Sequence, residues 1–136
     1  MNFLLFHREF SFPSSADGLN KCLIIVKEIS LIYSLDFEKK LAFHTVVVEA
    51  FENSIVHGNK GNRELFVIVK FSVNLNQIVI EIEDQGDGFD IINIPSPLTK
   101  ENISKESGRG IFFIKNLSSS FITIGRGNIV RININR

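Results

Sequence analysis

The sequence predicts an α+β fold, a two-layer sandwich in which helices pack on one face of a largely antiparallel mixed sheet. Stretches of alternating apolar residues predict strands, and most of them come in neighbouring pairs joined by short turns. Near the amino terminus, two segments instead carry apolar residues at three- and four-residue steps, which is typical of amphipathic helices. A chain of 136 residues has room for one domain, spanning 1–136.

The amino-terminal half predicts one strand and two helices. Residues 4–12 alternate loosely, as an edge strand does, and Ser15 or Asp17 is expected to cap the first helix. Asp36 is expected to cap the second helix, which runs to about His57 before 58–59 end it. The residues expected on one face of the first helix are Leu19, Leu23, Val26, Ile29 and Ile32.

The carboxyl-terminal half predicts two hairpins with a short helix between them. Residues 65–73 and 78–82 alternate on either side of a turn, and 121–124 pair with 129–134 across a glycine-rich turn. A short apolar helix is expected from Gly108 to Leu117. The preceding stretch, 90–107, has no sustained periodicity, so a functional or mobile loop is expected there.

Composition excludes several classes of protein. Hydrophobic residues make up 44% of the chain and charged residues 22%, as in globular proteins and unlike disordered tails or coiled coils. Fifteen basic residues balance fifteen acidic ones, so no net field favours direct binding of nucleic acid or an anionic membrane. One cysteine, Cys22, excludes an internal disulfide, and His7 and His44 have no partner at metal-ligand spacing. No apolar run is long enough to span a bilayer, so we expect a cytoplasmic protein.

Polar residues recur at every fourth position of the second predicted helix. Glu49, Asn53 and His57 would therefore project from one stripe of an otherwise apolar helix. An asparagine oxygen suits Mg²⁺, and a carboxylate one turn away could deprotonate an attacking hydroxyl. A solvated polar stripe is the alternative. Glu52 is the competing candidate for the base, but only Glu49 shares a face with Asn53.

A glycine-rich segment, Asp84-Gln85-Gly86-Asp87-Gly88, follows a predicted strand. Its glycines would let the backbone approach a flat ligand, and a carboxylate there could accept a hydrogen bond from an exocyclic amine. An ordinary turn is the alternative. A calcium loop is excluded, because it needs acidic residues where the glycines stand.

A second glycine pair, in Gly108-Arg109-Gly110, opens the short helix. Backbone N–H groups at a helix amino terminus can face an anion, and the helix dipole supports this. The chain contains no Gly-x-x-x-x-Gly-Lys-Ser/Thr sequence, so it is not a P-loop protein.

The order and spacing of these motifs resemble the Bergerat ATP-binding fold of the GHKL superfamily, which includes gyrase, Hsp90, histidine kinases and MutL. Within it, the chain resembles the branch of small anti-sigma factors and serine/threonine protein kinases. Residues 48–59 match that branch's helix almost position for position, and the resemblance covers nearly the whole chain.

The resemblance implies a role for each matching residue. Asn53 would ligate Mg²⁺ bridging the ATP phosphates, Glu49 would be the general base, and Asp84 would hold the adenine amino group. Residues 90–107 would form the ATP lid. The glycines that would shape the adenine pocket are Gly86 and Gly88, and the segment that would cover the phosphates is Gly108, Arg109 and Gly110.

The lid departs from the family pattern at one position. Similar proteins often carry a basic residue before the Ser-Gly of the lid, where Glu106 stands here. Lys105 or Arg109 could supply that charge instead.

The resemblance implies an anti-sigma factor that phosphorylates an anti-anti-sigma (STAS) protein with ATP and Mg²⁺, and that also binds a sigma factor. A homodimer built on the first helix or the opening strand is a further possibility. The alternatives are a non-catalytic module gated by nucleotide, a detached histidine-kinase catalytic domain, and a scaffold that has lost its nucleotide residues.

Overall fold

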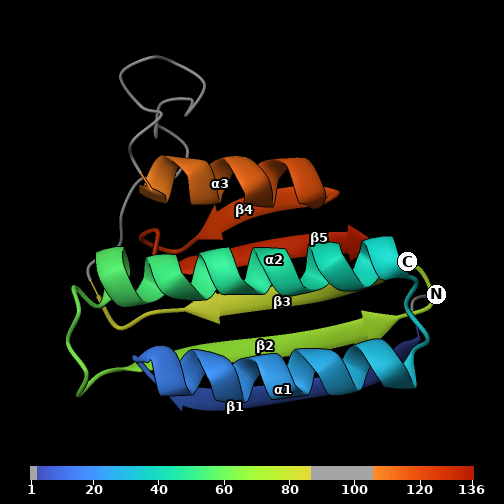
Figure 1. Ribbon diagram of the computed structural model, residues 1–136, viewed down its shortest axis with the longest axis horizontal. Helices are drawn as coiled ribbons and strands as arrows, with labels where there is room; N and C mark the ends of the chain where they lie inside the picture. Colours follow the sequence, from blue (N-terminus) through green and yellow to red (C-terminus); the bar gives the residue numbers. More distant parts are fainter. Residues whose placement is uncertain (1–2, 87–105) are drawn as a thin grey trace.

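The structure, a computed structural model, describes residues 3–86 and 106–136. It confirms the predicted architecture of one sheet with helices on one face (Figure 1). The elements are β1 (Leu4–Pro13), α1 (Ala16–Ile32), α2 (Phe37–Asn53), the π-helical turn η1 (Ser54–Gly58), β2 (Phe66–Asn74), β3 (Gln77–Glu83), α3 (Glu106–Leu117), β4 (Ser120–Ile124) and β5 (Ile129–Asn135).

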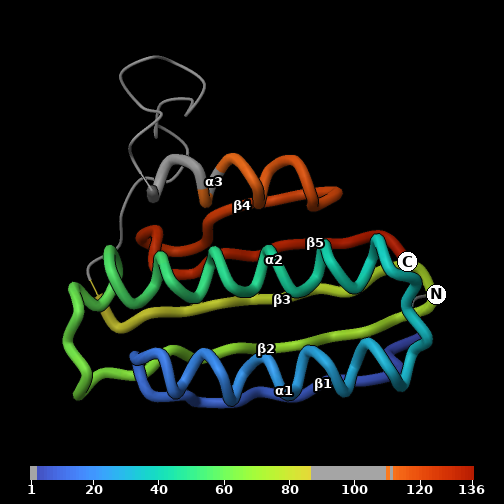
Figure 2. The backbone as a smooth tube through the Cα atoms, viewed as in Figure 1, coloured from blue at the N-terminus to red at the C-terminus, as the bar shows by residue number. Residues whose placement is uncertain are grey.

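The sheet has the strand order β1-β2-β3-β5-β4, and every pairing among the described strands is antiparallel. The last hairpin turns back, so that β5 lies between β3 and β4 (Figure 2). Gly125 and Gly127 have positive φ values of 66° and 92° in its turn, which glycine adopts without steric cost. This arrangement places the β4–β5 turn beside the end of β3, where Asp84 follows.

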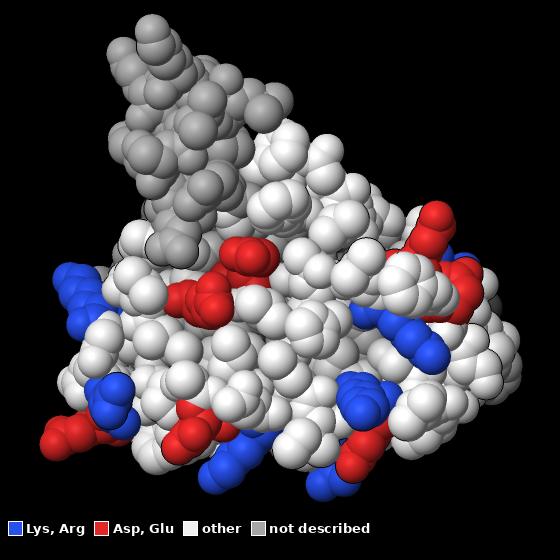
Figure 3. Space-filling view, viewed as in Figure 1, with Lys and Arg blue, Asp and Glu red and all other residues white. Residues whose placement is uncertain are grey.

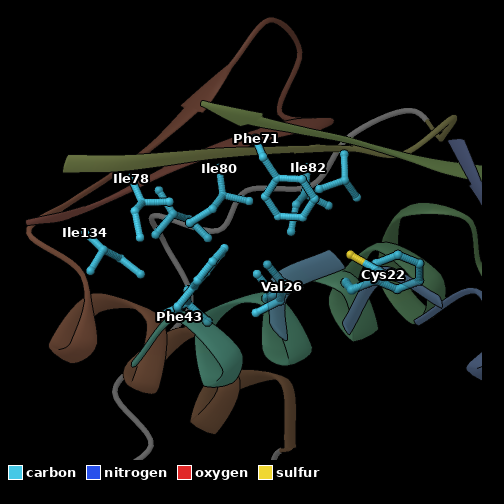
Figure 4. Close-up of a cluster of buried hydrophobic side chains, with 14 of the residues drawn as sticks. Cys22, Val26, Phe43, Phe71, Ile78, Ile80, Ile82 and Ile134 are labelled. Carbon is cyan, nitrogen blue, oxygen red and sulfur yellow. The ribbon is translucent and has the colours of Figure 1, made fainter. Parts of the chain in front are cut away.

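The core lies between the sheet and the helices (Figure 4). The inward residues of three neighbouring strands pair in register, with Phe71 opposite Ile80 and Ile80 opposite Ile132. Phe43 of α2 meets this row, and its ring centroid lies 6.0 Å from that of Phe71 in an edge-to-face contact. Cys22 is fully buried in the same core, as expected for a packing residue.

The helix caps confirm two of the sequence predictions. The Ser15 hydroxyl accepts a 3.2 Å hydrogen bond from the Gly18 amide, and Asp36 Oδ1 accepts one of 2.9 Å from the Lys39 amide. One residue of the face predicted for α1 lies outside the core. Ile32 is 65% exposed, because it is the last residue of the helix and the chain there turns away towards α2.

The opposite face of the sheet carries polar and charged side chains among some exposed apolar ones. Arg131 Nη2 lies 2.6 Å from Glu81 Oε1, and His7 Nδ1 lies 2.8 Å from the Ser72 hydroxyl. Such pairs suit a face in contact with water, which explains why the helices cover only the other one. No helix in residues 3–86 or 106–136 combines the length and apolarity needed to cross a bilayer.

Candidate functional site

Three of the described segments end or begin at one end of the molecule, on the left in Figure 1. They are the carboxyl end of α2 with η1, the end of β3, and the start of α3. These segments meet because α2 and β3 both run towards that end of the molecule and α3 begins there (Figure 1). The sequence-predicted residues in these segments therefore come together although they are far apart in the chain.

Glu49 and Asn53 lie one turn apart on α2 and face α3. A Cβ atom built on Gly110 would lie 2.7 Å from Glu49 Oε2 and 3.7 Å from Asn53 Nδ2. Gly110 therefore lets the α3 backbone approach the Glu49 carboxylate, and Asn53 lies just beyond it. The structure brings these three predicted residues together.

Asn53 is only 7% exposed, and its Nδ2 atom has no hydrogen-bond partner among the described residues. A buried polar group without a partner costs about 1–3 kcal/mol of stability. Such a group in a native protein calls for an explanation, such as an ordered water, a bound ion or ligand, or a part in a reaction. Asn53 is thus the polar group of this end whose surroundings are least explained by folding alone.

His57 does not continue the predicted stripe. It lies in η1, whose wider π-helical turn rotates it relative to an α-helical position, and it is exposed whereas Asn53 is buried. The spacing of four residues therefore defines a shared face only for Glu49 and Asn53.

Asp84 is buried directly after β3, with 3% of its surface exposed. Its Oδ1 accepts a 2.9 Å hydrogen bond from the Gly86 amide. A Cβ atom on Gly58 would overlap the Asp84 carboxyl group, and one on Gly86 would overlap the Gly58 carbonyl oxygen. Two glycines thus allow the end of η1 and the Asp84 loop to pack in direct contact, which fixes the carboxylate.

The pKa of the Asp84 carboxyl is raised from its ordinary value, chiefly because burial disfavours the charged form. The Gly86 amide and the Arg126 guanidinium act in the opposite direction, and Glu83 adds to the rise. The protein therefore keeps a carboxylate where ionisation is unfavourable, as functional sites often do.

Sequence reasoning missed the residues that hold this loop. Asn59, 2% exposed, accepts a 2.8 Å hydrogen bond from the Gln85 amide and donates one of 3.0 Å to the Phe66 carbonyl. From the β4–β5 turn, Arg126 Nη2 donates to the Gly86 carbonyl at 3.0 Å. Asn59 lies within residues 48–59, the segment that carries the family resemblance. Its place in that segment was the one feature of the sequence that could have identified it as part of the site. Nothing in the sequence pointed to Arg126.

Several predicted residues cannot be placed. Gly88, Lys105 and most of the predicted lid lie outside the described residues. Gly108 and Arg109 belong to the backbone of α3, but the Arg109 side chain is not among the described parts. The helix begins at Glu106 rather than at Gly108. Gly108 is therefore one of the first four residues of α3, whose N–H groups have no acceptor within the helix and are available to a ligand. Gly110 is the fifth residue, so its N–H group can bond within the helix.

Replacing Gly110 with alanine is expected to move the Glu49 carboxylate without unfolding α3. The added methyl group would crowd Glu49 Oε2, but alanine favours a helix over glycine by about 1 kcal/mol. We expect thermal unfolding to stay within a few degrees of wild type while any activity that depends on Glu49 falls. Lys115→Ala, at an exposed position of α3, is the matched control. Unchanged activity in Gly110→Ala would show that Glu49 need not be held at that position.

The raised pKa of Asp84 predicts how stability depends on pH. As pH rises, Asp84 loses its proton in the unfolded chain before it does so in the folded one, so the folded state is progressively destabilised. Over the pH range between the ordinary and the raised pKa of Asp84, the free energy of unfolding of wild type should therefore decrease relative to that of Asp84→Asn. Urea unfolding across that pH range measures the difference. A difference that rose with pH would mean that the folded protein stabilises the carboxylate.

The oxygen ligands available at this end of the molecule suit a metal ion that is bound together with the phosphates of a nucleotide. In residues 3–86 and 106–136, no cluster of three or more His, Cys, Asp or Glu could bind a metal ion alone. Mg²⁺ commonly uses one or two protein oxygens together with waters and substrate phosphates. The side-chain oxygen of Asn53, beside the Glu49 carboxylate, matches that requirement.

Comparison with known proteins agrees with this geometry. The family model for the histidine kinase-like ATPase domain matches residues 12–134. An anti-sigma F factor of Bacillus cereus (strain ATCC 14579) is 31% identical over 113 residues, which cover 79% of this chain and 77% of the relative. Those of Bacillus thuringiensis (strain Al Hakam) and Bacillus mycoides (strain KBAB4) have the same identity and coverage. The chain belongs to the histidine kinase-like ATPase family, in the anti-sigma regulatory branch of the GHKL superfamily.

Proposed function

We propose that this protein is an anti-sigma regulatory factor that binds ATP with Mg²⁺ and phosphorylates a serine or threonine of an anti-anti-sigma (STAS) protein. The observation that carries the proposal is the buried Asn53 side chain one turn from Glu49, whose Nδ2 atom has no partner among the described residues. The relatives named anti-sigma F factor support a sigma factor as one partner, and the STAS protein follows from the family resemblance.

Each residue has a defined part in this proposal. Asp84 accepts a hydrogen bond from the adenine amino group, and Gly86 and Gly88 leave room for the ring. Asn53 holds the metal, which when bound would neutralise charge on the phosphates. The residues that contact the phosphates are Gly108, Arg109 and Gly110.

Glu49 acts on the accepting hydroxyl group. Its carboxylate takes the hydroxyl proton while the oxygen forms a bond to the γ-phosphorus, and the bond from that phosphorus to the bridging oxygen of ADP breaks. Positioning supplies much of the rate, because it converts a reaction between separate molecules into one within a complex. Phosphorylation of the antagonist would then release it and leave the chain to bind a sigma factor.

A labelling experiment tests the proposal. The purified chain is incubated with γ-labelled ATP, Mg²⁺ and a STAS protein from the same genome. We expect acid-stable label on a serine or threonine of the STAS protein. Acid-labile label on a histidine would instead identify a histidine-kinase domain, and an ATP-dependent complex without label would identify a module gated by nucleotide.

A further inference from the structure

A groove of about 470 Å³ lies between α1 and α2, apart from the nucleotide end. Its size is in the range of binding pockets in proteins. Large apolar side chains line it although they are open to water, with Ile24 58%, Leu41 53% and Phe37 78% exposed. Folding alone does not require three such residues on one outer surface.

The lining residues follow the same spacing on both helices. Residues 20, 23, 24 and 27 of α1 and residues 37, 40, 41 and 44 of α2 share this spacing, and residues 26 and 30 of α1 complete the lining. Positions i, i+3, i+4 and i+7 lie on one face of a helix, so each helix presents a stripe along its axis. The two helices run in opposite directions side by side (Figure 2). The groove therefore runs along both axes, which is the shape that receives a third helix.

Two of the side chains that line the groove are charged at pH 7, and both are basic, although acidic side chains lie elsewhere on the same face (Figure 3). Lys27 and Lys40 line it together with His44, and no aspartate or glutamate is among its described lining residues. The space-filling view of this face shows a broad uncharged area with both blue basic and red acidic atoms at its borders (Figure 3). A ligand that fits must combine apolar residues with negative charge on its flanks.

We propose that this groove binds an amphipathic helix of a partner protein, with large apolar residues at i, i+3 or i+4, and i+7 and with Asp or Glu on both flanks. A second copy of this chain docked groove to groove is disfavoured, because a two-fold interface brings the same patch of both copies together and would place four lysines, Lys27 and Lys40 of each copy, in one interface without an acidic residue among the described lining. The inference deepens the proposed function, since it rests on this chain binding a protein partner.

The groove also shares an element with the nucleotide site. The amino-terminal half of α2 contributes Phe37, Lys40, Leu41 and His44 to the groove, and its carboxyl-terminal half carries Glu49 and Asn53. One rigid helix thus joins the two sites. A helix bound in the groove would leave the nucleotide end accessible.

A fluorescent peptide of about five helical turns tests the groove. It carries leucine at the three apolar positions and glutamate on the flanks, and a second peptide has lysine in place of each glutamate. Fluorescence anisotropy should show binding of the acidic peptide that is at least about tenfold tighter than that of the basic one, with the gap narrowing at high salt. Equal binding of the two peptides, or none up to about 1 mM, would overturn the proposal.

Variants locate the binding. Ile24→Glu should weaken the acidic peptide at least about tenfold, because it places a like charge in the groove. Lys40→Glu should weaken the acidic peptide and strengthen the basic one. Leu75→Glu, at a position 63% exposed in the β2–β3 turn, is the control and should change neither. Peptide binding that ignores Ile24→Glu and Lys40→Glu would overturn the assignment.

Two further measurements on the same proteins separate the possible failures. If calorimetry shows ATP binding but the peptide does not bind, the groove proposal alone fails. If ATP does not bind either, the proposed function fails as well. Sedimentation that shows a dimer dissociated by Ile24→Glu would make a second copy of the chain the occupant and overturn the inference.

Discussion

Replacing Glu49 with glutamine is expected to lower the rate of phosphate transfer by about 10²–10⁴-fold, the usual contribution of a general base. Glutamine keeps the size of the side chain beside Gly110 but cannot take the proton of the accepting hydroxyl. ATP affinity should stay within about threefold of wild type, because Asp84 and Asn53 are unchanged. Single-turnover labelling of the STAS protein measures the rate, and calorimetry measures the affinity.

Glu52→Gln is the matched control. Glu52 is the other carboxylate of this turn of α2, and it is exposed whereas Glu49 is half-buried against α3. We expect Glu52→Gln to transfer phosphate at the wild-type rate. If Glu52→Gln abolishes phosphate transfer and Glu49→Gln does not, then Glu52 rather than Glu49 is the general base and the assignment is wrong.

Replacing Asp84 with asparagine is expected to weaken both ATP and ADP by about 10- to 100-fold, the usual loss for a hydrogen bond to a charged group. The variant removes the carboxylate that accepts from the adenine amine, yet its amide oxygen can still accept from Gly86. Stability at neutral pH should not fall and is expected to rise, because burial disfavours the wild-type charge. Reduced affinity with undiminished stability distinguishes a functional carboxylate from a structural one.

Glu83→Gln, one residue earlier on the partly exposed end of β3, is the control for Asp84→Asn. It changes a neighbouring charge but not the buried group, so nucleotide affinity should remain close to wild type. Equal losses in the two variants would indicate a general electrostatic effect at this end of the sheet. Wild-type affinity in Asp84→Asn would remove Asp84 from the adenine pocket.

Most of the fold was predictable because local patterns and tertiary packing agree. In β2 and β3, the alternating residues identified from sequence are the buried ones, including Phe71 and Ile80. Turn chemistry located the hairpins, and capping residues located the starts of α1 and α2. These signals are short-ranged, so one sequence suffices to recognise them.

Other features depend on contacts between distant segments. The π-helical turn η1 follows α2 without any local sign, because apolar periodicity does not distinguish a π turn from another α turn. Asn59 was assigned only to the end of a helix, whereas its bonds to Gln85 and Phe66 join it to two other segments. Leu41 is an apolar residue of α2 that is nevertheless 53% exposed, and local sequence does not reveal how far α1 lies from it.

The candidate site was predictable as separate parts. Each motif alone could be explained as a solvated stripe or an ordinary turn. Their order along the chain led to the hypothesis of an ATP-binding site. The structure adds that Glu49 and Asn53 lie close to Gly110, and that Asp84 is held against Gly58 and Gly86. Contacts of this kind depend on the strand order, in which β5 lies between β3 and β4.

The most direct test of a nucleotide site at this end is calorimetric titration of ATP, with and without Mg²⁺, into wild type and Asn53→Ala. We expect wild type to bind one ATP per chain and to bind it more tightly with Mg²⁺. Asn53→Ala should lose that gain while unfolding no more easily than wild type, because the Nδ2 atom it removes has no partner among the described residues. No binding of ATP by folded wild type, or an Mg²⁺ effect that survives in Asn53→Ala, would contradict the account.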